Sequence, residues 1–192
     1  MTSENPVAIF NRWYANAARA GEHLPDAVAL ATSDRGRPSV RYVLLKGADD
    51  RGFVFYTNLG SPKARHLRAN PRAEMAFYWD KPGRQVRVGG RVVPVSAAEA
   101  DAYWDTRPRI SRLGGIASAQ SRPMPSRAAL LARLARVSLR YAGRHIPRPA
   151  NWSGFRIVPD RIEFWSRRSW RLHDRALFQR TRRGWKKTIL QP

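Results

Sequence analysis

The sequence contains no cysteine, which excludes disulfides, thiolate nucleophiles and cysteine-ligated metals. It has only four histidines, His23, His66, His145 and His173, and their spacing fits no metal site. No apolar run approaches the ~20 residues that a membrane-spanning helix needs, and the N-terminus lacks the order of charged and apolar residues found in signal peptides. We therefore expect a cytoplasmic protein with no membrane partner and no metal.

Acidic residues are also scarce, because 14 Asp and Glu stand against 36 Lys and Arg, for a formal net charge of +22. Such an excess is typical of proteins that bind nucleic acid or an anionic surface. Only five of the basic residues are lysines, however, and the arginines are spread from Arg12 to Arg183 without a separate stripe or tail. A strong arginine bias can also follow from codon composition. We therefore predict no specific nucleic-acid partner, only loose binding at low salt.

The 192 residues, 43% of them hydrophobic, suffice for one well-buried core, so we predict a single domain over residues 1–192. Short apolar runs and turn residues predict eight or nine strands, mostly joined by hairpins, with four helices inserted. Their sequential order favours a mainly β (α+β) antiparallel barrel over a parallel α/β sheet. The glycine motifs of Rossmann and P-loop phosphate sites are absent.

The predicted elements can be placed by residue number. The predicted helices cover residues 5–21, 61–70, 96–107 and 127–141. Asn5 is expected to cap the first, which belongs to an N-terminal helical arm, residues 1–24, and Ser96 with Glu99 forms a capping box at the third. The predicted strands cover residues 27–32, 41–46, 53–57, 72–79, 84–95, 155–158, 161–165, 176–179 and 185–190, and the first two are expected to form a hairpin. Residues 109–125 are rich in glycine and serine and lack periodicity. They fit either a mobile lid over a site or an ordinary surface loop.

The stretch from Arg41 to Lys63 organises the rest. Its two strands and the turn between them predict a hairpin, and Ser61 is a good N-cap for the helix that follows. This arrangement brings three polar residues of the hairpin, Arg41, Lys46 and Thr57, close to the N-terminus of that helix. Free backbone N–H groups together with Arg and Lys side chains form an anion site. The same pattern also fits an ordinary hairpin with solvated charges.

Taken together, the motifs resemble those of the pyridoxine (pyridoxamine) 5′-phosphate oxidase family. The matching stretches are Arg41-Tyr42-Val43-Leu44-Leu45-Lys46, Phe55-Tyr56-Thr57-Asn58, Asn70-Pro71, Arg84-Gln85-Val86, Arg107-Pro108, Gln120-Ser121, Ile162-Glu163-Phe164-Trp165 and Arg171-Leu172-His173-Asp174-Arg175. The likeness extends from about Asn5 to Pro192, and the order and spacing of the motifs are together highly specific.

The resemblance implies an antiparallel split β-barrel that forms a homodimer and binds FMN at the subunit interface. The residues implied to hold the flavin are Arg41, Tyr56, Thr57, Lys63, Gln85, Gln120, Ser121, Trp165 and Arg175. Those implied to hold the substrate phosphate are Lys46, Tyr103, Arg107 and Ser111, and those implied to bind the pyridine ring and act in catalysis are Arg171 and His173. Two groups of Arg, Lys and hydroxyl donors suit two phosphates.

The activity implied is FMN-dependent oxidation of pyridoxine 5′-phosphate or pyridoxamine 5′-phosphate to pyridoxal 5′-phosphate, with molecular oxygen as acceptor and hydrogen peroxide as product. A sister FMN oxidase of the phenazine-biosynthesis type is one alternative, although its precursor has no phosphate to occupy the second donor group. A split-barrel protein that binds FMN or pyridoxal phosphate without catalysis is another.

Several positions depart from the family pattern. Pro62 stands where a basic residue usually precedes the lysine, and the other departures are Ile110, Arg112, Ile116 and Arg122. These last four all lie in the predicted lid segment. They therefore bear on substrate identity more than on fold or cofactor, whereas Pro62 removes a charge near the expected flavin phosphate.

Overall fold

The computed structural model describes residues 4–192. Within them the helices are α1 (Pro6–Arg19), α2 (Pro62–Ala69), α3 (Ala97–Thr106), α4 (Arg109–Ala117), α5 (Arg127–Arg140) and the short 3₁₀ helix η1 (Ser169–Arg171). The strands are β1 (Ala27–Asp34), β2 (Arg37–Leu44), β3 (Gly47–Asp49), β4 (Gly52–Asn58), β5 (Arg72–Trp79), β6 (Arg84–Pro94), β7 (Trp152–Ser166), β8 (Asp174–Thr181) and β9 (Gly184–Leu190). None of these helices is long and apolar enough to span a membrane.

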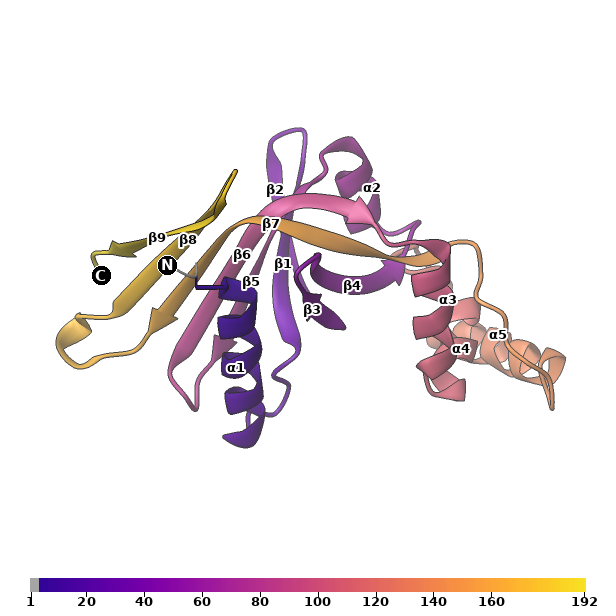
Figure 1. Ribbon diagram of the computed structural model, residues 1–192. Coiled ribbons are helices and arrows are strands. Elements are labelled where there is room, and N and C mark those ends of the chain that lie inside the picture. The colour runs from indigo at the N-terminus through magenta and orange to yellow at the C-terminus, as the bar shows by residue number, and fades with distance from the viewer. Residues whose placement is uncertain (1–3) are drawn as a thin grey trace.

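The strands form one antiparallel sheet in the order β2-β1-β5-β6-β7-β4-β3, with β8 added to β7 and β9 to β8 (Figure 1). In the view of Figure 1, α3, α4 and α5 gather at the right-hand end, while the β8–β9 hairpin lies at the left-hand end. The mainly β antiparallel fold expected from the sequence is confirmed.

β7 is the strand that both ends of the sheet share. β6 pairs with it over most of its length, whereas β4 pairs with residues 152–157 and β8 with residues 161–166. The register of β6 shifts between Gly89 and Gly90, and a Cβ at Gly90 would lie 2.1 Å from the Val158 carbonyl oxygen. Glycine thus permits a β-bulge, at which β7 bends from one partner to the other. The prediction of two strands, 155–158 and 161–165, is wrong because Pro159 falls at this bulge, where its missing N–H is tolerated.

The pairing of β2 also differs from the prediction. β2 pairs with β1, with Leu30 opposite Arg41, so the predicted hairpin between these two strands is confirmed. The hairpin partner of β4 is the three-residue strand β3, in which Ala48 lies opposite Phe53. The predicted hairpin between residues 41–46 and 53–57 is therefore wrong. The apolar run does form a strand, but the six residues after it hold a separate tight hairpin and not a simple turn.

The main core lies between α1 and the sheet. Asn5 caps α1 by accepting from the Val7 N–H at 2.9 Å, as the sequence predicts. Phe10, fully buried, contacts the rings of Phe53 and Phe77 at centroid distances of 4.8 and 5.0 Å. These contacts fix α1 against the barrel interior, and α1 is thus a core element.

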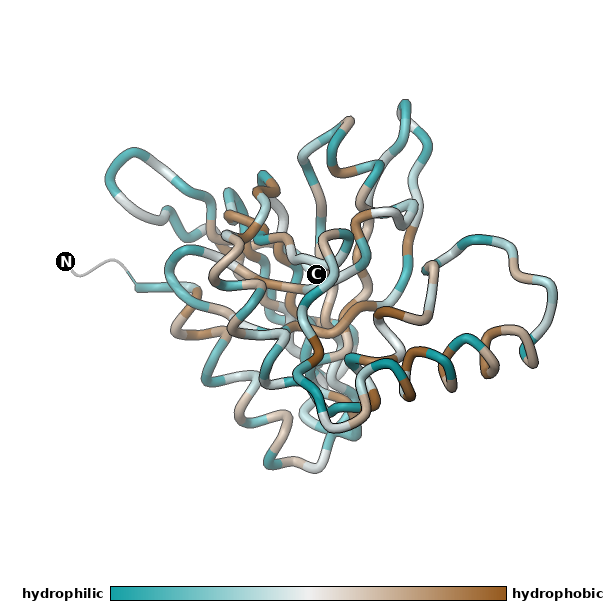
Figure 2. Tube along the Cα trace, turned by 90° about the vertical axis from the view of Figure 1, so that its right-hand side faces the viewer, coloured by the Kyte–Doolittle hydropathy of each residue, from teal (hydrophilic) through white to brown (hydrophobic). Residues whose placement is uncertain are grey.

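A smaller core joins α3, α4 and α5, which face the viewer in Figure 2. Ser96 and Glu99 form the predicted capping box of α3. Residues 109–117 are helical, with Leu113 and Ala117 buried, so the prediction that 109–125 lacks regular structure is wrong over this part. Two adjacent glycines at 114 and 115 hide the helical period in the sequence. Hydrophobic and hydrophilic turns alternate along α5 in Figure 2, and none of its residues is buried.

Candidate functional site

A cleft of about 240 Å³ lies where α2, α3 and the ends of β2, β4 and β7 meet. It is lined by Tyr42, Val43, Leu44, Lys46, Tyr56, Thr57, Lys63, Tyr103, Arg107, Gln120 and Trp152. A neighbouring hollow of about 300 Å³ shares Tyr56, Thr57, Arg107, Gln120 and Trp152 with it. The two hollows therefore belong to one site. Seven of the predicted flavin and phosphate residues line it.

One end of the cleft is built from short polar side chains around Lys63. The Lys63 Nζ donates to Thr57 Oγ1 at 3.1 Å, and Thr57 Oγ1 donates in turn to Gln120 Oε1 at 3.3 Å. Gln120 Oε1 also accepts from the Asn58 N–H at 3.2 Å, which ties the loop after α4 to β4. Ser61 occupies the N-cap position of α2, but its side chain makes no capping bond and its Oγ lies 3.4 Å from Thr57 Oγ1. Hydroxyl groups thus collect at the start of α2.

The positive charge at this end has no acidic counterpart. Arg41 donates only to neutral oxygens, those of Leu30, Thr32 and Ser39, at 2.6 to 3.1 Å. Lys63 is 7% exposed, and burial together with the nearby Arg41 lowers its pKa. Burial likewise lowers the pKa of Arg41. Two neighbouring cations without a carboxylate partner among residues 4–192 form a site that a bound anion would neutralise.

The wall of the cleft is a stack of three aromatic rings. Tyr56 lies between Tyr103 and Trp152, at centroid distances of 4.0 and 5.3 Å and interplanar angles of 12° and 3°. Gly154 pairs with Tyr56 across the sheet, and a Cβ there would come within 2.7 Å of the Tyr56 ring. Glycine at this position therefore lets the ring lie flat over β7. The result is a flat apolar surface beside the cations.

Two further cations, Arg107 and Lys46, line the cleft. The Arg107 guanidinium lies over the rings of Trp104 and Trp152, and its Nη1 is buried without a hydrogen-bond partner among residues 4–192. Burial lowers the pKa of Arg107. Lys46 differs, because its Nζ pairs with Asp26 at 2.8 Å.

A second group of predicted residues lies in a row across β6, β7 and β8. Gln85 is opposite Trp165, and Trp165 is opposite Arg175. Arg175 is already held by Glu163, through its Nε at 2.9 Å and its Nη2 at 2.8 Å. The His173 ring lies 4.6 Å from that of Trp165.

The loop between β7 and β8 carries the two predicted catalytic residues. The Arg168 N–H donates to His173 Nδ1 at 3.2 Å, so the neutral ring carries its proton on Nε2. Trp170 and Arg171 both adopt left-handed backbone angles, with φ of 60° and 61°. Non-glycine residues in this region are strained by about 1–3 kcal/mol each, and such strain is concentrated at functional sites.

The two groups are far apart within one chain. Trp152 lines the cleft at one end of β7, and Trp165 follows thirteen residues later on the same strand. At ~3.3 Å per residue this is a separation of up to roughly 40 Å, reduced somewhat by the bend. Figure 1 shows β7 running between these two ends. The length of β7 therefore separates Trp152 and the cleft from the row that contains Trp165.

The remaining predicted residues lie near the cleft without lining it. Ser111 is in the first turn of α4, and Ser121, with a φ of 65°, lines a different hollow between α4 and α5. The sequence reasoning missed Trp104 and Trp152, which hold Arg107. Pairing β7 with β4 would have revealed Trp152, because that pairing puts it opposite Asn58, beside the predicted Thr57.

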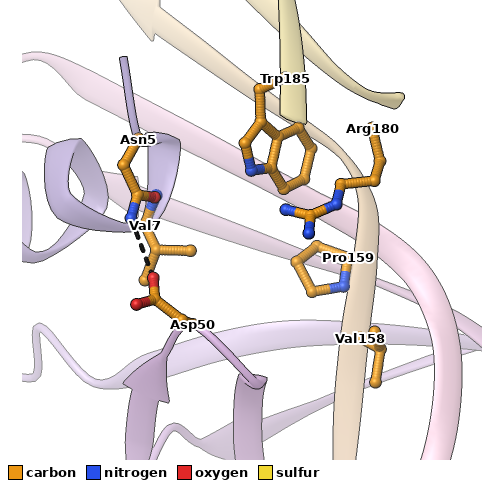
Figure 3. A pocket seen from close by; sticks show the side chains of 7 residues that line it. All are labelled: Asn5, Val7, Asp50, Val158, Pro159, Arg180 and Trp185. Atoms are coloured by element: carbon orange, nitrogen blue, oxygen red, sulfur yellow. Dashed lines mark hydrogen bonds between the residues drawn. The ribbon is translucent and has the colours of Figure 1, made fainter. Parts of the chain in front are cut away.

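Another cavity, of about 380 Å³, lies where α1, the β3–β4 turn and the β8–β9 hairpin meet. Figure 3 shows the Asn5 amide donating to Asp50 on one side and Arg180 beside Trp185 on the other. None of the predicted site residues lines it.

Comparison with family models gives two matches that together cover most of the chain. Residues 15–141 match the model described as pyridoxamine 5′-phosphate oxidase, and residues 152–192 match the model described as the pyridoxine 5′-phosphate oxidase C-terminal dimerisation region. The chain therefore belongs to the pyridoxamine 5′-phosphate oxidase family.

Curated relatives and solved structures agree with this assignment. A pyridoxine/pyridoxamine 5′-phosphate oxidase of Gluconobacter oxydans is 53% identical over 98% of this chain and 94% of its own length. Another, from Rubrobacter xylanophilus, is 52% identical over 98% of this chain and 87% of its own.

Among solved structures, PhzG from Burkholderia lata, in complex with tetrahydrophenazine-1-carboxylic acid, superposes with a TM-score of 0.94 at 36% identity, over 100% of this chain and 94% of the other. A pyridoxamine 5′-phosphate oxidase-related, FMN-binding protein of Nostoc punctiforme shares the fold, with a TM-score of 0.80 at 19% identity and full coverage of both chains. The split-barrel prediction is confirmed.

Proposed function

We propose that this chain is an FMN-dependent oxidase that converts pyridoxine 5′-phosphate or pyridoxamine 5′-phosphate to pyridoxal 5′-phosphate, with oxygen as acceptor and hydrogen peroxide as product. The observation that carries the proposal is a set of cations without carboxylate partners among residues 4–192, placed around one aromatic-walled cleft: buried Lys63 with half-buried Arg41 at one end, and half-buried Arg107 at the other. Relatives about 50% identical over nearly the whole chain bear the name of this activity.

The residues present fit FMN. Arg41, Lys63 and Thr57 would hold its phosphate, because a half-buried and a buried cation and a hydroxyl supply donors that no carboxylate among residues 4–192 uses. Tyr56 and Gln120 would flank it, with Ser121 nearby on the same loop. When bound, the flavin supplies the redox chemistry, taking a hydride from the substrate and passing electrons to oxygen. The chain supplies binding, orientation and proton handling.

The substrate phosphate is assigned to Arg107, Lys46 and Tyr103, with Ser111 of α4 completing the set. Lys46 is partly neutralised by Asp26, so Arg107 contributes the larger free charge. The ring of the substrate would then face Arg171 and His173. His173 presents its Nε2–H outward because its Nδ1 is occupied by the Arg168 amide, and it can therefore donate to an oxygen or nitrogen at the reacting carbon.

The site is completed by a second copy of the chain. Gln85, Trp165 and Arg175, assigned to the flavin, lie with the catalytic pair toward the far end of β7 from Trp152, and we assign them to the partner of a homodimer. The match of residues 152–192 to a dimerisation region supports this arrangement. Within each copy we assign residues 1–192 to a single domain, because β7 and β8 of that region continue the sheet of β4 and β6.

Mixing two variants tests the shared site. Arg107→Ala damages one end and His173→Ala the other, and each homodimer has both sites defective. Heterodimers have one site with both defects and one intact site. Random mixing, assayed below the substrate KM, should therefore restore up to about a quarter of wild-type activity. No recovery would mean that each site is built within one chain.

The proposed activity has a direct test. The purified protein should release FMN and not FAD, should bleach under anaerobic conditions with pyridoxamine 5′-phosphate, and should form hydrogen peroxide in air. The likeness to PhzG favours one rival, an oxidase of a tricyclic carboxylic acid of the phenazine type. Flavin that bleaches with such a dihydro substrate but not with the phosphorylated vitamin would establish the rival. If FMN is bound but neither substrate bleaches it, the chain would be a protein that binds FMN without this catalysis.

A further inference from the structure

Arg107 is half-buried, and its guanidinium is held in an unusual way for a cation. Its guanidinium carbon lies 5.0 Å from the ring centroid of Trp104 and 4.8 Å from that of Trp152. The two indoles meet edge to face, with centroids 4.8 Å apart at 65°, and they are only 1% and 6% exposed. The guanidinium therefore rests in a corner formed by two buried aromatic rings.

No carboxylate among residues 4–192 pairs with Arg107, although α3 carries acidic residues nearby. Asp101 pairs with Arg148 at 2.6 Å, and Asp105 is turned toward Arg112 at 3.6 Å. The Nη1 of Arg107 is buried and has no hydrogen-bond partner in this part of the chain. Its charge is thus surrounded by rings and left unneutralised.

Arg156, another arginine of this chain, is held by carboxylates and not by aromatic rings. It is 6% exposed and pairs with two carboxylates, Asp49 at 3.1 Å and Glu99 at 2.5 Å. The N–H donors of such a guanidinium are occupied by carboxylates of the protein itself. A phosphate could bind it only by displacing a carboxylate.

The aromatic corner is itself rigid. Trp104 Nε1 donates to the Ile146 carbonyl at 2.9 Å, which fixes the ring plane. Gly115 of α4 closes the other side, since a Cβ there would lie 3.1 Å from the Trp104 ring and 3.3 Å from Arg107 Nη1. A larger residue at this position would displace the ring or the guanidinium.

We propose that Trp104 and Trp152 are positioning residues that hold Arg107 by cation–π contacts in place of an ion pair, so that its full charge and its free N–H donors serve the phosphate of the substrate. The proposal rests on the proposed function, in which Arg107 binds that phosphate. A ring attracts the cation through its quadrupole but carries no net charge and accepts no N–H bond in the guanidinium plane. It therefore orients the group without competing with an anion.

The decisive variant is Trp152→Leu, with Trp152→Phe as the matched control that keeps an aromatic face. Loss of the ring should raise KM for pyridoxine 5′-phosphate about 3- to 30-fold, the range expected for a cation–π contact, with kcat within about twofold. The ratio of kcat/KM for the phosphorylated over the unphosphorylated substrate should fall by a similar factor, because pyridoxine presents nothing for Arg107 to bind. Trp152→Phe should restore most of the wild-type KM.

A double-mutant cycle separates positioning from general damage. In an Arg107→Ala background, Trp152→Leu should have no further effect on the ratio of kcat/KM for the phosphorylated over the unphosphorylated substrate. A further fall in that ratio, or an equal loss with both substrates, would overturn the proposal. If Arg107→Ala alone leaves KM for the phosphorylated substrate unchanged, it is the phosphate assignment of the proposed function that fails.

A second measurement covers the case in which Trp152→Leu does not fold. Fluorinated tryptophan, incorporated throughout, keeps ring shape but weakens the quadrupole. Increasing fluorination should raise KM for the phosphorylated substrate step by step, with no such trend in the Arg107→Ala variant. A flat KM across the series would overturn the proposal as well.

Discussion

The cations at the two ends of β7 differ in whether a carboxylate of the protein neutralises them. At the Trp152 end, Lys63 is buried and Arg107 half-buried, and neither has a carboxylate partner in the described chain. At the Trp165 end, Arg175 is held by Glu163, and Glu163 also accepts from Arg87 at 3.2 Å. Ion pairs of the second kind are complete within the protein, whereas lone buried cations are costly unless a ligand supplies the anion. The difference separates cations that are left for a bound anion from cations whose charge is neutralised within the protein.

The largest effect should come from removing both lone cations beside Thr57. In Arg41→Ala/Lys63→Ala, each lost charge-assisted contact should weaken FMN binding by about 1.5–3 kcal/mol, which is roughly ten- to a hundredfold. The protein should be purified without flavin, and titration with FMN measures the loss. Arg161→Ala is the control, because Arg161 already pairs with Glu74 at 2.5 Å. Full retention of FMN by the double variant would contradict the assignment of these unpaired cations to the flavin phosphate.

At the Trp165 end, loss of an ion pair should lower the stability of the protein and should not change the charge available to the flavin phosphate. Glu163 is 8% exposed and bridges Arg87 and Arg175, so Glu163→Gln should lower the free energy of unfolding by about 1–3 kcal/mol. Denaturant titration of the apo-protein measures it. An unchanged midpoint would show that this network contributes nothing.

Lys63→Met should have a smaller effect with the opposite sign, raising apo-protein stability by about 1 kcal/mol while weakening FMN binding. The folded pKa of Lys63 lies below its unfolded value of 10.5, so the charged form is disfavoured in the fold. That cost is complete below the folded pKa and disappears as pH rises to 10.5. Wild-type apo-protein should therefore gain stability relative to Lys63→Met across that window. Parallel pH profiles would refute the assignment, and bound FMN should abolish the difference.

The smallest effect belongs to an exposed pair. Arg168 and Asp174 form a salt bridge at 2.6 Å, but their side chains are 62% and 63% exposed. Arg168→Ala should change the free energy of unfolding by less than about 0.5 kcal/mol. It should also leave His173 in place, because that residue is bonded by the Arg168 backbone N–H and not by the side chain.

Local patterns in the sequence predicted most of the individual elements. The cap at Asn5, the capping box at Ser96 and the strand over residues 72–79 all depend on neighbouring residues and are confirmed. The failures involve partners distant in sequence. The pairing of β4 with β7 depends on the bulge at Gly90, and so does the continuation of β7 through Pro159.

The same limit applies to the candidate site. Sequence motifs named Lys63 and Arg107 and predicted that Arg41 lies near the helix that carries the first, but they could not show that the second rests on two indoles. Nor could they show that the predicted residues fall into two groups at opposite ends of one strand. That division is a property of the sheet and not of any motif, and it gives a structural reason for the second copy that the resemblance implies.

β7 also determines when the cleft can form during folding. The β5–β6 and β8–β9 hairpins join strands that are adjacent in sequence, but Asn58 and Trp152, opposite each other in β4 and β7, are about ninety residues apart. Closing so long a loop is slow, so we expect this pairing to come late. Until then Tyr56 has no Trp152 to stack against, and the cofactor has no complete surface to bind. We therefore expect the flavin to bind after the sheet has formed, and to stabilise the finished sheet without guiding its assembly.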